Sequence, residues 1–141
     1  ATIEKVVALA ILMPIVASMG GIAGMQSLAL VIRSQALDQI GISNSRLLII
    51  KEASIGVLNG ILWSSVVALA VYLWFNSIFL GIVIASALMI NLIIGAISGV
   101  SLPLILSKLK IDPALAGGVI LTTITDIVGF ISLLGIATLI M

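Results

Sequence analysis

The last stretch of the chain, residues 113–141, reads PALAGGVILTTITDIVGFISLLGIATLIM and carries one charged side chain, that of Asp126. A helix needs about 20 apolar residues to cross the hydrocarbon core of a bilayer, so this stretch predicts a membrane span. Asp126 falls near its middle, where a carboxylate costs on the order of 2.5–3.5 kcal/mol on insertion scales. An acid at that depth is by default a hypothesis of a functional site.

The composition predicts the same environment for the whole chain. Of the 141 residues, 62% are hydrophobic and 8% are charged, and the mean hydropathy is +1.47, whereas soluble domains carry about 25% charged residues. Long apolar runs separated by short polar segments indicate helices rather than the alternating strands of a barrel. We therefore predict an all-α integral membrane protein, one helical bundle with spans at about 3–32, 52–74, 78–106 and 113–141.

Two residue types are missing from the sequence, and their absence limits the kinds of catalytic and metal site that it can form. The chain has no histidine and no cysteine, which removes the commonest general base, thiolate ligands and Ser-His nucleophiles. A metal would need carboxylate, hydroxyl, amide, carbonyl or water oxygens, which suit hard cations such as Mg²⁺, Ca²⁺ and Mn²⁺. The net charge of +1 gives no indication of a nucleic-acid partner, so the expected surroundings are membrane lipid.

The first span combines a proline with several small residues. Pro14 precedes Gly20, Gly21 and Gly24, a pattern that predicts a kink or local unwinding. On a helical wheel one face holds Pro14, Ser18, Gly21, Ile22, Met25 and Ala29. This face is either a small-residue seam for a neighbouring helix or the wall of a water-filled cavity.

The two middle spans carry stripes of small and polar residues. The second span places Glu52, Gly56, Asn59, Gly60 and Trp63 on one stripe, and the third places Asn91, Gly95, Ser98 and Gly99 on another. We expect Asn59 and Asn91 to donate hydrogen bonds between helices. Asp112 followed by Pro113 predicts the capped start of the last helix.

The basic residues indicate an orientation for this multi-pass protein. Lys and Arg occur in the segments 33–51 and 107–112 but not around 75–77, so the two basic loops are expected in the cytoplasm, with both chain ends on the far side of the cell (inner) membrane. The chain begins with Ala1 rather than Met, which indicates a fragment or a processed chain.

The last helix has a polar face at its centre. Thr122, Thr125, Gly118 and Gly129 fall on the side of Asp126. Threonine hydroxyls can bond their own backbone, so the threonines allow a purely structural interpretation. Asp126 is either open to water or an ion, or protonated and bonded across a helix pair. In a homodimer, two such carboxylates around one axis would attract a divalent cation.

Several elements, taken in order along nearly the whole chain, resemble the transmembrane domain of MgtE-type Mg²⁺ channels. The elements are Pro14 followed by Gly-Gly-x-Ala-Gly-x-Gln at 20–26, Leu-Asn-Gly at 58–60, Asn91 with Leu102-Pro103, Asp-Pro-Ala at 112–114, and Thr-Thr-x-Thr-Asp-x-x-Gly-Phe at 122–130. The resemblance implies a transporter rather than an enzyme.

The family's domain is a homodimer of five spans per chain, conducting Mg²⁺ along an axis lined by its second and fifth helices. This chain would match spans two to five, with its first and last helices as the lining. The implied metal site is Asp126 with carbonyls at Thr122 and near Ser18. The implied pore-lining or structural residues are Pro14, Gly20, Gly21, Ile22, Gly24, Gln26, Gly118, Thr125 and Gly129.

The sequence departs from the family pattern in two places. Ile22 stands where the family usually has Asn after Gly-Gly, and Gly118-Val119 replaces Gly-Pro. Neither the N domain nor the CBS domain, through which many members close at high Mg²⁺, is in this sequence; they lie outside the segment, or the protein is an ungated relative. The alternatives are transport of another hard divalent cation and a non-transporting membrane scaffold. An intramembrane aspartyl protease would need two embedded aspartates, and the spans offer one.

Overall fold

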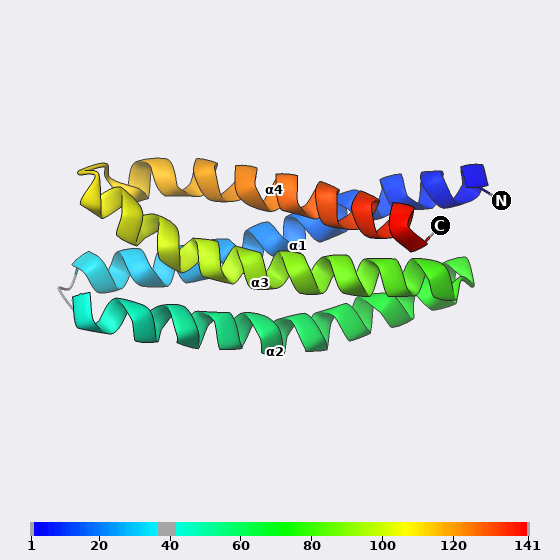
Figure 1. Cartoon of the computed structure of the whole chain (residues 1–141), viewed down its shortest axis with the longest axis horizontal. Helices are drawn as coiled ribbons and strands as arrows, with labels where there is room; N and C mark the ends of the chain where they lie inside the picture. Colours follow the sequence, from blue (N-terminus) through cyan, green and yellow to red (C-terminus); the bar gives the residue numbers. More distant parts are fainter. Residues whose placement is uncertain (1, 37–41, 141) are drawn as a thin grey trace.

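The computed structural model describes residues 2–36 and 42–140, which form four long helices (Figure 1). They are α1 (Thr2–Ala36), α2 (Ile42–Phe75), α3 (Ile78–Lys108) and α4 (Pro113–Ile140). Each contains a stretch long and apolar enough to cross a membrane: Val7–Arg33, Leu47–Phe75, Ile78–Lys108 and Ala116–Ile140. The prediction of an all-α membrane bundle with four spans is confirmed.

Helix α3 holds the bundle together, because it packs against α1, α2 and α4, and α1 also packs against α4. The α2–α3 turn lies at the end of the bundle where α1 begins and α4 ends (Figure 1). The α3–α4 turn, the end of α1 and the start of α2 lie at the opposite end. The exposed Arg33 and Lys108 stand in the last turns of α1 and α3, and the exposed Lys110 follows in the α3–α4 turn, so all three belong to that second end. These three basic residues therefore lie at one end of the molecule, whereas Lys5 belongs to the start of α1 at the other end.

The two described connections show why the helices stop where they do. Asn76 adopts a positive φ of 52°, and the hydroxyl of Ser77 accepts a hydrogen bond from the Leu80 N–H at 3.3 Å, which caps α3. Lys110 has a φ of 60°. The Asp112 carbonyl then accepts the Ala116 N–H at 3.2 Å, so Asp112 occupies the N-cap position expected for it.

Two sequence-based expectations differ from the structure. The local unwinding of α1 is wrong, since the helix continues through Pro14 and the glycines; a membrane helix can lose one backbone bond at proline when neighbouring helices pack against it. The alternative of a kink stays a prediction. Helix α2 begins at Ile42, so the polar loop expected over 33–51 is largely helical; the part of it at residues 37–41 lies outside the described residues.

Paired glycines bring α1 and α3 into backbone contact. A Cβ added at Gly95 would lie 2.5 Å from the Gly20 carbonyl oxygen, and one added at Gly24 would lie 2.9 Å from the Gly95 carbonyl oxygen. Gly99 faces the Gly24 backbone in the same way. Close approach of this kind drives helix association in lipid, where burial of apolar surface gives no advantage.

Two buried polar side chains tie helices together beside this crossing. The Asn91 Nδ2 donates to the Val16 carbonyl at 2.7 Å, joining α3 to α1, as predicted. The Ser27 hydroxyl donates to the Glu52 Oε2 at 2.9 Å, joining α1 to α2. Both bonds hold α1, the helix that carries most of the candidate site residues.

Candidate ion-binding groove

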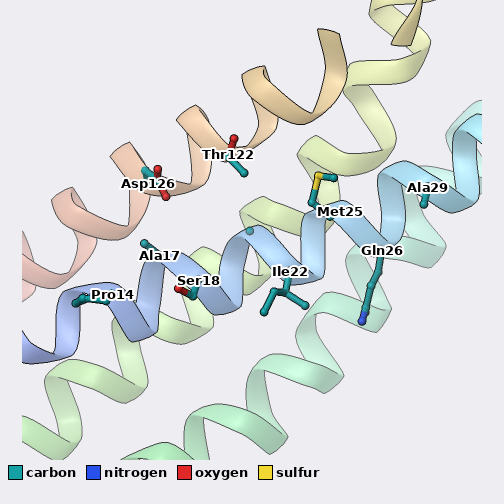
Figure 2. Close-up of a pocket in the computed structure, with 10 residues that line it drawn as sticks. Pro14, Ala17, Ser18, Ile22, Met25, Gln26, Ala29, Thr122 and Asp126 are labelled. Carbon is teal, nitrogen blue, oxygen red and sulfur yellow. The ribbon is translucent and has the colours of Figure 1, made fainter. Parts of the chain in front are cut away.

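A groove of about 650 Å³ runs between α1 and α4 (Figure 2). Its lining comes from two turns of α4 and from one long face of α1. The lining residues are Pro14, Ala17, Ser18, Gly21, Ile22, Met25, Gln26, Ala29, Thr122 and Asp126. All six residues of the α1 face predicted from the helical wheel are among them, so that face is the wall of a cavity.

Small residues set the distance between the two walls. A Cβ on Gly129 of α4 would lie 3.4 Å from the Ala17 Cα, and one on Gly21 of α1 would lie 3.6 Å from the Thr125 hydroxyl oxygen. The Leu121 side chain fills the space next to Gly24, 2.9 Å from where a Cβ would stand. The glycines thus let α4 lie close against α1 at the level of Asp126.

Asp126 is the carboxylate of the groove. Its side chain is exposed and lies across the groove from Ala17 and Ser18 (Figure 2). Within the described part of the chain, neither Asp126 nor Ser18 has a hydrogen-bond or ion-pair partner. Since Asp126 lies ten residues after Ala116, where the α4 span begins, an unpartnered acid faces an open space deep in the apolar part of the bundle.

The hydroxyl groups of the three threonines at 122, 123 and 125 donate hydrogen bonds to carbonyls of their own helix, α4. The Thr122 hydroxyl donates to the Gly118 carbonyl at 2.7 Å, and the Thr123 hydroxyl donates to the Val119 carbonyl at 2.7 Å. The buried Thr125 hydroxyl donates to the Thr122 carbonyl at 3.2 Å. That carbonyl, implied as an ion ligand by the resemblance, therefore already accepts a side-chain hydrogen bond within α4.

The remaining predicted residues divide between groove and packing. Gln26 lines the groove, whereas Gly20 and Gly24 are buried in the α1–α3 crossing, and Thr125 and Gly129 are buried between α4 and its neighbours. Gly118 is half-buried, and a Cβ there would lie 3.5 Å from the Met25 methyl group. The four glycines and Thr125 thus set how the helices pack beside the groove and are not part of its lining.

Ala17 is a lining residue that the sequence reasoning missed. It stands one turn after Pro14 and one turn before Gly21, so the helical spacing of positions 14, 17 and 21 was the signal for it. Asn59, expected to bond another helix, has no hydrogen-bond partner in the described part of the chain and lines a different cavity.

The polar side chains that line the groove could offer a metal ion a carboxylate, hydroxyl groups and an amide. The described residues contain no group of three His, Cys, Asp or Glu side chains that could hold a metal ion, so one chain offers a single carboxylate here. A hydroxyl at Ser18 and an amide at Gln26 share the groove with it. Oxygen and amide ligands of this kind fit a hard cation that keeps its water shell.

A bundle of four membrane-length helices, with an exposed carboxylate in a groove at the apolar middle of the bundle, defines a multi-pass membrane protein. Comparison with known families gives a narrower result. Residues 13–136 match the family model of MgtE, described as a divalent cation transporter. The chain belongs to the MgtE family.

Curated relatives agree with this assignment. The chain is 41% identical over 136 residues to the magnesium transporter MgtE of Bacillus subtilis, covering 96% of this chain and 30% of the relative. It is 30% identical over 133 residues to the MgtE of Enterococcus faecalis, covering 94% and 29%, and 31% identical over 139 residues to that of Thermus thermophilus, covering 99% and 31%. The chain thus spans about three-tenths of the length of these relatives.

Proposed function

We propose that this protein transports divalent cations, with Mg²⁺ as the principal ion, along the axis of a homodimer in the cell (inner) membrane. The observation that carries the proposal is the unpartnered Asp126 in the α1–α4 groove. Three relatives named as magnesium transporters support the choice of ion. The basic end of the bundle would face the cytoplasm, and both chain ends the far side.

The homodimer supplies what one chain lacks. Two copies related by a two-fold axis would bring two Asp126 carboxylates to one ion, which balances a charge of 2+ and removes the repulsion between the acids. The groove walls from α1 and α4 would then line the pathway. Ser18, Gln26 and Thr122 would contact the ion's water shell rather than the bare ion, because Mg²⁺ gives up water reluctantly.

The membrane potential would drive the ion inward. Moving one charge through 100 mV is worth about 2.3 kcal/mol, so a divalent ion gains about 4.6 kcal/mol. A site built from two carboxylates and water-mediated contacts holds the ion loosely enough to release it into the cytoplasm. Transport through such a site requires that binding be favourable but not tight.

Substitution of the acid tests the proposal. In the full-length protein reconstituted into vesicles, Asp126→Asn is expected to reduce Mg²⁺ influx at least tenfold while the dimer survives, because an amide of the same shape cannot attract the ion. Thr123→Val is the matched control: its hydroxyl bonds only the Val119 carbonyl of its own helix, and influx should stay within twofold of wild type. Undiminished influx in Asp126→Asn would refute the proposal, and a more stable, fully functional Asp126→Leu would favour a scaffold.

A further inference from the structure

The side chain of Asn91 lies next to the Asp126 groove, where α1, α3 and α4 meet. It is fully buried, and its Nδ2 donates to the Val16 carbonyl of α1 at 2.7 Å. The same Nδ2 lies 3.1 Å from where a Cβ on Gly129 of α4 would stand. One amide on α3 therefore lies against both helices that form the walls of the groove.

These two contacts are at the level of the candidate ion site. Val16 comes just before Ala17 and Ser18 in α1. Those two residues lie across the groove from Asp126 (Figure 2). On α4, Gly129 stands one turn after Asp126. A movement of the α1 backbone at Val16 would consequently change the distance between Ser18 and Asp126.

The packing around the Asn91 amide leaves it no room to move by itself. A Cβ on Gly20 of α1 would lie 2.6 Å from the Asn91 Cγ, so α1 comes this close only because position 20 is glycine. Gly129 makes the corresponding room on α4. In an interior packed at this density, a side chain held between two helices moves only when a helix moves. The amide thus fixes the place of α1 against α3 and α4.

The hydrogen bonds of Asn91 indicate that its contribution is to position rather than to stability. Its Oδ1 is buried and has no hydrogen-bond partner among the described residues. The bond to Val16 stabilises the bundle modestly, whereas a buried acceptor without a donor costs at least as much. An amide therefore gives little net stability at this place, but it sets the direction and the distance of the α1 backbone.

We propose that Asn91 is a positioning residue for the Asp126 ion site. Its bond to the Val16 carbonyl holds α1 at the distance from α4 at which the Ser18 and Asp126 side chains share the water shell of one divalent cation. Asn91 does not itself touch the ion, because it is buried outside the lining of the groove. Binding sites depend on such support, since their side chains must be held within about 0.5 Å. The proposal rests on the proposed function.

Asn91→Leu in the full-length protein tests it. A leucine methyl needs about 3.5 Å from the Val16 carbonyl oxygen in place of the 2.7 Å of the present bond, so α1 has to move. Binding of Mg²⁺ to the folded state raises the thermal unfolding midpoint. The part of this rise that Asp126→Asn abolishes should need at least tenfold more Mg²⁺ in Asn91→Leu. Mg²⁺ influx into vesicles at sub-saturating Mg²⁺ should fall by the same factor.

Two matched controls separate position from stability. Ser27→Ala removes the other buried bond of α1, so its midpoint without Mg²⁺ should fall while its Mg²⁺ requirement stays within twofold of wild type. Asn59→Leu makes the same substitution at an asparagine that has no partner among the described residues and does not line the groove; its Mg²⁺ requirement should also stay within twofold. If Asn91→Leu yields no folded protein, Asn91→Ala, which removes the amide without adding volume, takes its place.

The opposite results distinguish this proposal from the proposed function. A Mg²⁺ requirement of the Asn91 variant no higher than that of Ser27→Ala means that Asn91 only stabilises the bundle, and an equal rise in Asn59→Leu means that the effect is unspecific; either overturns the proposal. In the Asp126→Asn background, Asn91→Leu should cause no further loss of Mg²⁺ response, and a further loss would place its effect at another site. A midpoint rise that Asp126→Asn leaves intact counts against the proposed function instead.

Discussion

At the scale of single residues, the bundle holds a buried acid away from the groove. Glu52 is 3% exposed and Ser27 is 5% exposed, and the 2.9 Å bond between them joins α2 to α1 near their basic ends. A buried acceptor that loses its donor keeps its full desolvation cost.

Ser27→Ala is therefore expected to lower the free energy of unfolding by about 1–3 kcal/mol. The measurement is the thermal unfolding midpoint of the purified protein in detergent. Ser54→Ala is the matched control, because the exposed Ser54 hydroxyl bonds only the Ile50 carbonyl of its own helix, and its midpoint should hardly move. Equal midpoints for the two variants would show that the Ser27–Glu52 bond contributes nothing.

At the scale of helices, glycine decides how closely α1, α3 and α4 approach. Gly20, Gly24, Gly95 and Gly99 form a small-residue crossing in which each helix lies against the backbone of the other. The crossing fixes the rotation of α1, and that rotation turns the face with Ser18 toward the groove. One side of α1 thus packs against α3, and another side of the same helix lines the groove.

Gly95→Ala is expected to push α1 away from α3, because its Cβ would stand 2.5 Å from the Gly20 carbonyl oxygen. Overpacking of a tight interface costs about 1–3 kcal/mol, so the unfolding midpoint should fall and Mg²⁺ influx with it. Gly135→Ala on α4 is the control: a Cβ there meets nothing within 4 Å, and the better helix propensity of alanine should leave stability unchanged or slightly higher. A Gly95→Ala protein as stable as wild type would contradict the role given to the crossing.

At the scale of the whole molecule, the bundle leaves much of α1 uncovered between α4 and α2. Exposed apolar residues of this face include Ile22 at 60% and Met25 at 41%, beside the unpartnered Asp126. Lipid can cover the apolar residues but not the acid. A second copy of the chain would cover both, which is the arrangement proposed for transport.

Met25→Cys is expected to form a covalent dimer in membranes with a short bifunctional thiol reagent, because residues lining the groove lie near the proposed two-fold axis and meet their own copies there. Gel electrophoresis of the treated membranes measures the dimer. Leu69→Cys, 60% exposed on α2, should remain monomeric under the same treatment. Dimers from Leu69→Cys and none from Met25→Cys would place the axis on another face.

Much of this architecture is determined by the sequence alone. The four spans, the exceptional Asp126 and the α1 face that lines the groove follow from run length and helical periodicity, which are local properties of the chain. The tertiary structure decided which helix each face meets. Thr125 and Gly129 share a side of α4 with Asp126 in sequence, but the packing of α1 and α3 buries them and leaves the acid exposed.

The two asparagines show the same limit. Asn91 and Asn59 both stand on small-residue stripes, yet Asn91 bonds the Val16 carbonyl of α1, while Asn59 lines a cavity between α1 and α2 and has no partner among the described residues. A helical wheel gives the direction of a side chain but not the distance of the neighbouring helix in that direction. That distance depends on glycines in other helices. The sequence therefore determined that an acid lies in the middle of the last span. Only the packing of α1, α3 and α4 against one another decided which residues surround that acid.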